Sequence, residues 1–183
     1  MKYAIACNLN GDVVDYHKKL VNEIAQNFGV IFPVKQKLEP HFTLKYGFEA
    51  TDNGIKEVEG VIEKFCAVHK RTPVQVGGFG SFRKDVIFIE IKLSAKAQQL
   101  FLDFMNELKK VSWLAWEEHD GKQLNFHATI AADCEKKYTE IFSFIEGKER
   151  LFDCWFDNIT LWKEGAMVDG IITWEMHKTF KLG

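Results

Sequence analysis

The sequence has little of what marks secreted, disulfide-bonded or membrane proteins. Its four cysteines form no CxxC pair and have no metal-ligand spacing, so we expect neither a disulfide framework nor a zinc site. No apolar run approaches the roughly 20 residues that cross a bilayer, and the run before Asn8 is too short for a signal peptide. We therefore expect a cytoplasmic protein that is neither exported nor inserted in a membrane.

The chain also lacks an excess of positive charge. Its 24 Lys and Arg against 26 Asp and Glu give a formal net charge of −2 at pH 7. Proteins that bind long nucleic acids draw much of their binding free energy from Lys and Arg that displace counterions from the phosphates. The charge therefore argues against a DNA duplex as partner and favours a short or terminal substrate. We expect no cofactor.

No stretch rich in Gly, Ser or Pro divides the chain, which contains only three prolines. With 46% hydrophobic and 14% aromatic residues, it can build a substantial core. We therefore expect residues 1–183 to form one domain, and we favour a monomer.

Hydrophobic periodicity predicts the same order of elements, strand, helix, strand, helix, strand, in both halves of the chain. The first half has expected strands at 3–9 and 41–48, helices at 13–28 and 55–65, and a third strand that begins near 73. The second half has expected strands at 86–93 and 126–132, helices at 97–108 and 138–145, and late strands at 154–162 and 171–182. The pattern predicts a duplicated unit with a pseudo-two-fold axis, whose two lobes are built from approximately residues 1–83 and 84–183.

Each half carries a His-x-Thr segment at the same place in this order, because His41 and His127 are 86 residues apart while Tyr3 and Val86 are 83 apart. Side chains alternate between the two faces of a strand. On the first strand the polar face holds His41, Thr43 and Lys45, and the core face holds Phe42, Leu44 and Tyr46. On the second strand the polar face holds His127 and Thr129, and the core face holds Phe126, Ala128 and Ile130.

Two imidazoles and two hydroxyls around one phosphate form a plausible catalyst. Histidine titrates near neutral pH, so one imidazole can act as general base and the other as general acid. The threonine hydroxyls can donate hydrogen bonds to the non-bridging oxygens as charge builds up at phosphorus. Lys45 is either a further phosphate ligand or a solvated lysine, and the sequence leaves both open. A metal is not required, and no Asp or Glu stands beside either motif to complete a zinc site.

A third His-x-Thr segment, His177 to Thr179, also lies on an alternating strand, so alternation alone does not select the site. It lies only 50 residues after His127 and therefore does not share the offset of about 85 residues that relates the two halves of the chain. We favour His41 and His127, which have this offset, and interpret His177 as an exposed strand residue. His17 and His69 lie on expected helices and receive no role.

These segments resemble the motifs of the two-histidine (2H) phosphoesterase superfamily, which includes 2′-5′ RNA ligase-like proteins and cyclic phosphodiesterases. Residues 40–44 are similar to the first family motif and residues 126–130 to the second. Residues 78–90 are similar to the family's central strand pair, and residues 156–162 to a late strand. The resemblance covers the whole chain and implies a LigT-like, bilobal α+β fold, in which antiparallel sheets line a central cleft and helices lie outside.

The resemblance also implies catalysis by His41 and His127, with the phosphate held by Thr43 and Thr129. We expect a hydrolase that acts on a small nucleotide or RNA-end substrate with a 2′,3′-cyclic phosphate or a 2′,5′ linkage. Which imidazole is the base stays open. The alternatives are RNA 2′-5′ ligation and a non-catalytic RNA or nucleotide-binding module that keeps the fold.

Overall fold

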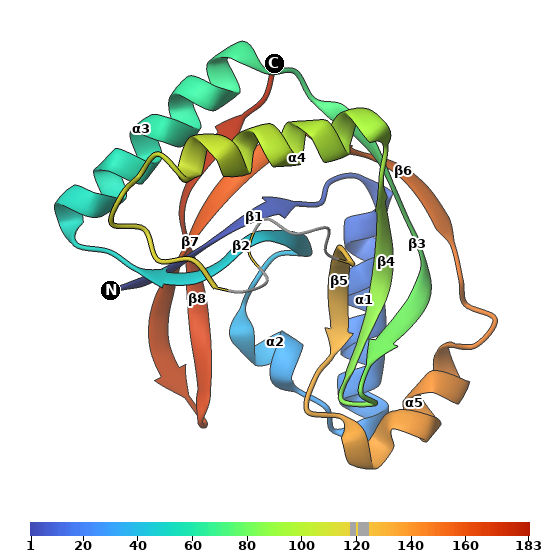
Figure 1. The fold of residues 1–183 in the computed structure, drawn as a ribbon. Coiled ribbons are helices and arrows are strands. Elements are labelled where there is room, and N and C mark those ends of the chain that lie inside the picture. The colour runs from blue at the N-terminus through green and yellow to red at the C-terminus, as the bar shows by residue number, and fades with distance from the viewer. Residues whose placement is uncertain (118–119, 121–124) are drawn as a thin grey trace.

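The computed structural model describes residues 1–117, 120 and 125–183 (Figure 1). Along the chain they form β1 (Lys2–Asn8), α1 (Asp12–Phe28), α2 (Phe32–Gln36), β2 (His41–Glu49), α3 (Asp52–Val68), β3 (Thr72–Phe82), β4 (Val86–Leu93), α4 (Ala95–Leu108), β5 (His127–Ala131), the 3₁₀ turn η1 (Glu135–Lys137), α5 (Tyr138–Ile145), β6 (Leu151–Phe156), β7 (Asn158–Val168) and β8 (Ile171–Lys181). The short helix α2 is an element that periodicity does not predict. Pro33 lies in its first turn, where the missing N–H of proline costs no helical hydrogen bond.

The strands form two antiparallel sheets. Sheet A has the order β2-β1-β7-β8, and sheet B has the order β5-β4-β3-β6. In each sheet the strand that begins with a motif histidine lies at an edge, and β2 and β5 contact each other. The expected α+β fold, a pseudo-two-fold arrangement of two antiparallel sheets with helices outside, is confirmed.

The sheets do not follow the predicted division of the chain at residue 83. Sheet A takes its strands from both ends of the chain, whereas sheet B takes its strands from residues 72–156. The predicted boundary lies inside the tight turn of the β3–β4 hairpin, where Arg83 and Lys84 both have positive φ, 46° and 60°. Strands joined by such a turn pair with each other, so lobes built from 1–83 and 84–183 are not what the chain forms. Instead, β3 crosses to sheet B and β7 crosses to sheet A.

Local sequence signals explain where the helices begin and end. The hydroxyls of Thr51 and Ser94 cap α3 and α4 by accepting hydrogen bonds from the backbone N–H groups of Gly54 and Ala97. Gly29 ends α1 in the left-handed conformation, which costs little for a residue without a Cβ. None of the described helices is long and apolar enough to span a membrane.

The helices cover the outer faces of the sheets. Figure 1 shows α3 and α4 side by side at the top, and Phe65 of α3 contacts Phe104 of α4 with ring centroids 5.1 Å apart. Helix α1 packs along the edge strand β5, and α3 contacts β7 and β8 of sheet A. The core continues between the sheets, where the Phe42 ring lies 5.5 Å from that of Phe156. All four cysteines are buried and free.

Side-chain alternation fails in the middle of β2. Ala6 of β1 pairs with Thr43, but the preceding residue Ile5 pairs with Lys45, so β2 contains an extra residue at a β-bulge. Consequently Lys45 is buried, with 1% of its surface exposed, and Tyr46 is 68% exposed. The expectations that Lys45 continues the polar face and that Tyr46 packs in the core are wrong.

Candidate functional site

His41 is the first residue of β2, and its ring is held by the backbone just before the strand. Phe42 and Leu44 are fully buried on the core face, as alternation predicts, and this fixes the strand on sheet A. The Nδ1 of His41 lies 2.8 Å from the carbonyl oxygen of Glu39. A carbonyl can only accept, so Nδ1 carries the proton and, in the neutral ring, Nε2 carries the lone pair.

His127 begins β5 in the same way. Ala128 and Ile130 are fully buried on the core face, and the imidazole Nδ1 donates to the carbonyl oxygen of Asn125 at 2.8 Å. Each histidine therefore bonds the carbonyl two residues before it and has the same tautomer as the other. The duplication thus extends from the order of the elements to the hydrogen-bonding state of the two rings.

The edge strands bring the two histidines together. The rings of Phe42 and Phe126, which neighbour the two histidines in sequence, meet edge to face with centroids 5.7 Å apart. The charge of His127 contributes to lowering the pKa of His41, so the two imidazoles lie within electrostatic reach of each other. His41 and His127 thus lie at the contact between the two edge strands, and their joint role in a site stays a prediction.

Thr43 and Thr129 are half-buried two residues after their histidines. Each is paired across its ladder with a residue of the next strand, Thr43 with Ala6 and Thr129 with Phe88. Within the described part of the chain, neither hydroxyl has a hydrogen-bond partner. A threonine hydroxyl carries one donor, so both can serve an anion that enters between the strands.

Aromatic rings surround His127. Its ring centroid lies 5.0 Å from that of Phe82 and 4.9 Å from that of Phe88. Burial lowers the pKa of His127, while the hydrogen bond to the carbonyl of Asn125 opposes that shift. A neutral imidazole at pH 7 is the form that can accept a proton.

A polar network lies next to His41 on sheet A. Asn8 stands opposite His41 in the β1–β2 ladder, and its Oδ1 accepts a hydrogen bond from Nε1 of Trp162 at 3.2 Å. The side chain of Asn158 bonds both the N–H and the carbonyl of Asn8, at 3.0 and 2.8 Å, which fixes the end of β1. Burial lowers the pKa of His41, the hydrogen bond to the Glu39 carbonyl opposes this, and the charge of His127 adds to it.

Lys45 has neither of the two environments that the sequence left open. Its Nζ lies 2.6 Å from Oδ2 of Asp120, and the side chain is fully buried. The ammonium also lies 4.8 Å from the ring centroid of Trp116 and 5.8 Å from that of Phe48. Because this charge is paired and shielded from water, we do not include Lys45 among the phosphate ligands.

His177 lies elsewhere. Its Nε2 is 2.8 Å from a carboxylate oxygen of Glu59 on α3, and its ring packs edge to face on Tyr3. The third His-x-Thr segment is thus bound to the helix that covers sheet A. No contact between described residues links it to His41 or His127.

A carboxylate also stands near the pair, because Glu90 lies opposite His127 in the β4–β5 ladder. Two imidazoles and a carboxylate are the smallest common set of protein ligands in catalytic zinc sites. Among residues 1–117, 120 and 125–183, however, no three His, Cys, Asp or Glu side chains are grouped so that they could hold a metal ion.

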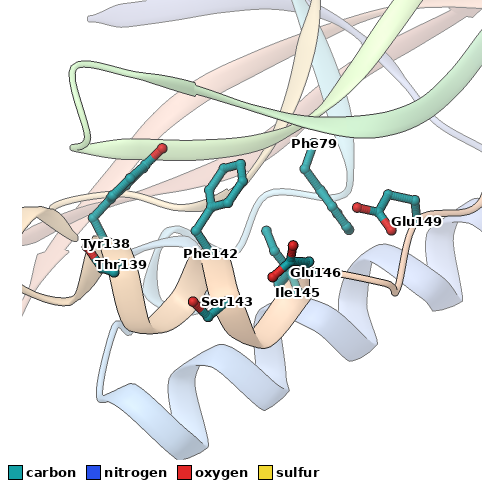
Figure 2. Close-up of a pocket in the computed structure, with 8 residues that line it drawn as sticks. All are labelled: Phe79, Tyr138, Thr139, Phe142, Ser143, Ile145, Glu146 and Glu149. Carbon is teal, nitrogen blue, oxygen red and sulfur yellow. The ribbon is translucent and has the colours of Figure 1, made fainter.

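A pocket of about 330 Å³ lies away from the histidines, between α5 and β3 (Figure 2). In Figure 2 the side chains of Tyr138 and Phe142 point from α5 toward the strand β3, and Phe79 of β3 points back toward α5. Residues that stand opposite each other in an antiparallel sheet point to the same face, and Phe79, Ile89 and Ala128 stand opposite one another on three adjacent strands. Thr129 stands opposite Phe88, one residue along β4 from Ile89, so its side chain lies on the other face. The pocket therefore opens on the face of sheet B opposite to that of the motif side chains, and we do not assign the site to it.

Sequence reasoning missed the groups that orient the site. The carbonyls of Glu39 and Asn125 are backbone atoms, which no residue pattern reveals. His17 received no role, yet it is buried and its Nε2 lies 2.9 Å from the carbonyl oxygen of Thr129. The sequence signal for its burial was its place four residues after Val13 and three before Leu20, on the apolar face of the helix.

Several solved structures share this fold. The protein TT0787 of Thermus thermophilus is 13% identical, with a TM-score of 0.71 over 100% of this chain and 98% of that one. LigT of E. coli complexed with 3′-AMP is 12% identical, with a TM-score of 0.66 over 99% and 97% of the two chains. A protein described only as a phosphoesterase has a TM-score of 0.66 at 13% identity over 99% and 97%. At sequence identities this low, the structural similarity shows that the fold is shared and no more.

The sequence itself matches no protein with a curated function. It does match the family model of the 2′-5′ RNA ligase superfamily over residues 17–166, a span that contains both His-x-Thr strands. Together with the fold and the paired motif histidines, this match shows that the chain belongs to the 2′-5′ RNA ligase superfamily, the 2H phosphoesterases.

Proposed function

We propose that this protein is a metal-independent phosphoesterase that acts on a nucleotide or RNA-derived phosphodiester, a 2′,3′-cyclic phosphate or a 2′,5′ linkage. The observation that carries the proposal is the matching state of the two imidazoles. In each ring, Nδ1–H donates a hydrogen bond to the carbonyl two residues earlier, so Nε2 is the nitrogen left to exchange a proton with the substrate. The same atom can accept a proton as base or, once protonated, return it as acid.

In the proposed hydrolysis of a cyclic phosphate, one Nε2 removes a proton from water as the water oxygen attacks phosphorus. The bond from phosphorus to the 2′ or 3′ oxygen breaks, and the protonated Nε2 of the other imidazole protonates the leaving oxygen. The hydroxyls of Thr43 and Thr129 donate to the non-bridging oxygens, whose charge rises in the transition state. The two imidazoles have exchanged protonation states at the end, and one proton exchange with solvent restores them.

The lowered pKa values suit this cycle. Burial keeps both free imidazoles neutral at pH 7, and a bound phosphodiester anion favours protonation of one of them by attraction. Substrate binding thus supplies the acid that the empty site lacks. Nucleotides are a reasonable class of substrate, because LigT, which shares the fold, has been solved with 3′-AMP, NADP⁺ and ATP.

The test is to incubate the purified protein with the four 2′,3′-cyclic mononucleotides and with 2′,5′-linked dinucleotides, with and without EDTA. The variants are His41→Gln and His127→Gln, and His177→Gln is the matched control from the third His-x-Thr segment. We expect each motif variant to lose about 10²–10⁴-fold in kcat, which is the usual contribution of a positioned proton-transfer group. The control should keep the wild-type rate.

Two results would refute parts of the proposal. Loss of activity with EDTA, restored by a divalent metal, would refute the metal-independent mechanism. Full activity in His41→Gln or His127→Gln would refute the paired-histidine assignment. Thr43→Val and Thr129→Val should each lower kcat more than they raise KM, because their hydrogen bonds strengthen as charge builds up on the phosphate oxygens.

A further inference from the structure

His17 on α1 is a buried histidine for which the proposed reaction has no direct use. Only 7% of its surface is exposed, and its Nε2 lies 2.9 Å from the carbonyl oxygen of Thr129. Since a carbonyl accepts, Nε2 carries the proton, which is the opposite tautomer to that of His41 and His127. Its Nδ1 is buried without a hydrogen-bond partner in the described residues. The ring therefore makes one hydrogen bond, and it makes it to the strand of His127.

The carbonyl of Thr129 points outward from the free edge of sheet B, toward α1. Ile91 N–H donates to the carbonyl of Phe126, and hydrogen-bonded pairs alternate along an antiparallel ladder. The pair Phe88–Thr129 is therefore not hydrogen-bonded, and the N–H and C=O of Thr129 face the free edge of β5. No further strand of sheet B follows at this edge in the described part of the chain. The donor comes instead from α1, which packs along β5.

The next residue of α1 reaches the other motif. Nζ of Lys18 lies 2.6 Å from a carboxylate oxygen of Glu39, whose carbonyl holds the ring of His41. Helix α1 thus contacts the chain before His41 and the strand of His127 through two successive residues. The Lys18–Glu39 pair is about half exposed on both sides and contributes little, whereas the His17 bond is buried.

The surroundings of His17 keep it neutral. Burial lowers the pKa of His17 to about 4, with the charges of His41 and Lys18 adding to the shift and the Thr129 carbonyl opposing it. At neutral pH the ring is thus a pure hydrogen-bond donor to β5. It places no positive charge beside His41, which must accept or return a proton.

We propose that His17 is a positioning residue, which fixes the free edge of β5 and so holds Thr129 and His127 in register with His41. This proposal rests on the proposed function, because it assigns His17 to the same site. Proton transfer and phosphate contacts demand a geometry held within about 0.5 Å, and an edge strand without its outer hydrogen bond has more freedom than that. His17 acts through Thr129 and His127 and does not touch the substrate.

Three variants separate positioning from packing. In His17→Gln the side-chain amide nitrogen is as many bonds from Cα as the imidazole Nε2, so it can still donate to the Thr129 carbonyl. In His17→Asn the amide is one bond too short, and in His17→Leu there is no donor. His177→Gln, His177→Asn and His177→Leu are the matched controls. We expect the Leu and Asn variants to lose about 10-fold or more in kcat with KM changed less than about threefold, below the 10²–10³ for deleting a transition-state donor. The Gln variant should recover most of the loss.

A second readout does not depend on turnover. Imidazole ¹⁵N spectra of the wild-type protein should show His17 protonated on Nε2, and His41 and His127 protonated on Nδ1. The His127 resonances and titration midpoint should shift in His17→Leu and His17→Asn and return in His17→Gln. If the wild type turns over no substrate but these shifts appear, the proposed function fails while the positioning role of His17 stands.

Other outcomes would overturn the positioning role. One is a folded His17→Leu or His17→Asn variant with wild-type kcat and an unchanged His127 spectrum. Another is equal loss in Gln and Asn, which would show that packing rather than the hydrogen bond is what β5 needs. If His17→Leu does not fold, the comparison of His17→Gln with His17→Asn still tests the proposal, because both carry the same amide and differ by one CH2, and the spectrum of His127 reports whether the hydrogen bond to β5 is kept.

Discussion

The buried neutral state of His17 has a consequence for stability that can be measured without a substrate. The pKa of His17 is about 4 in the folded protein against 6.5 for an ordinary histidine. Between these values the unfolded chain binds a proton that the folded protein does not. The folded state therefore keeps its full stability above pH 6.5 and loses it as the pH falls toward 4.

The magnitude follows from the two pKa values. Integrating the difference in bound protons gives a loss of about 2 kcal/mol between pH 7 and pH 5, and about 3 kcal/mol by pH 4. In His17→Gln this term is absent, because the amide does not titrate. All other histidines and carboxylates are common to the two proteins, so their contributions cancel when the variant is compared with the wild type.

The assay is urea unfolding of the wild type and of His17→Gln at pH 7, 6 and 5, at constant ionic strength. Whatever the variant costs at pH 7, its stability relative to the wild type should rise by about 2 kcal/mol at pH 5. A difference that is the same at pH 7 and pH 5 would refute the reasoning. It would mean that His17 takes up its proton in the folded protein as easily as in the unfolded chain.

Other features give further expected outcomes. Lys45→Met removes the cation that pairs with the buried carboxylate of Asp120, which keeps the hydrogen bond from the Glu117 N–H, and should lower the free energy of unfolding by about 3–5 kcal/mol in urea titrations. A loss under about 1 kcal/mol would show that the pair is solvated. Thr51→Ala and Ser94→Ala each remove a helix cap and should each cost about 1 kcal/mol in the same assay, whereas no loss would mean that water replaces the hydroxyl. The pKa values of His41 and His127 are lowered, so the midpoint of the acidic limb in a plot of log kcat/KM against pH should lie below pH 6.5. An acidic limb with its midpoint above pH 6.5 would contradict the neutral resting state of the two imidazoles.

The secondary structure was largely predictable, because it depends on local signals. The expected strand at 86–93 is the observed β4, and the expected helix at 97–108 ends with α4 at Leu108. Gly29 and Ser94 end and cap the helices where their backbone and side-chain chemistry favours it. Each of these features is decided by a few neighbouring residues, and a sequence shows its neighbours directly.

The division into lobes and the role of Lys45 were not predictable in the same way. The β3–β4 hairpin is a local contact, but the pairing of β7 with β1 and of β6 with β3 joins strands far apart in the chain and depends on contacts across the fold. The bulge after Thr43 inverts the pattern for Lys45 and Tyr46, and a bulge depends on the partner strand. Asp120, the partner of Lys45, is 75 residues away in the chain.

The sequence alone determined the candidate chemistry. Two His-x-Thr strands in equivalent halves put an imidazole and a hydroxyl on one face of each strand, since alternation is a property of the backbone itself. Only the tertiary structure decided how those groups are held. The contact of β2 with β5, the carbonyls of Glu39 and Asn125 that fix the tautomers, and the bond from His17 to Thr129 join segments or backbone atoms that no linear pattern connects. A strand can dictate where its own side chains point, but what lies across from them depends on how the whole chain packs.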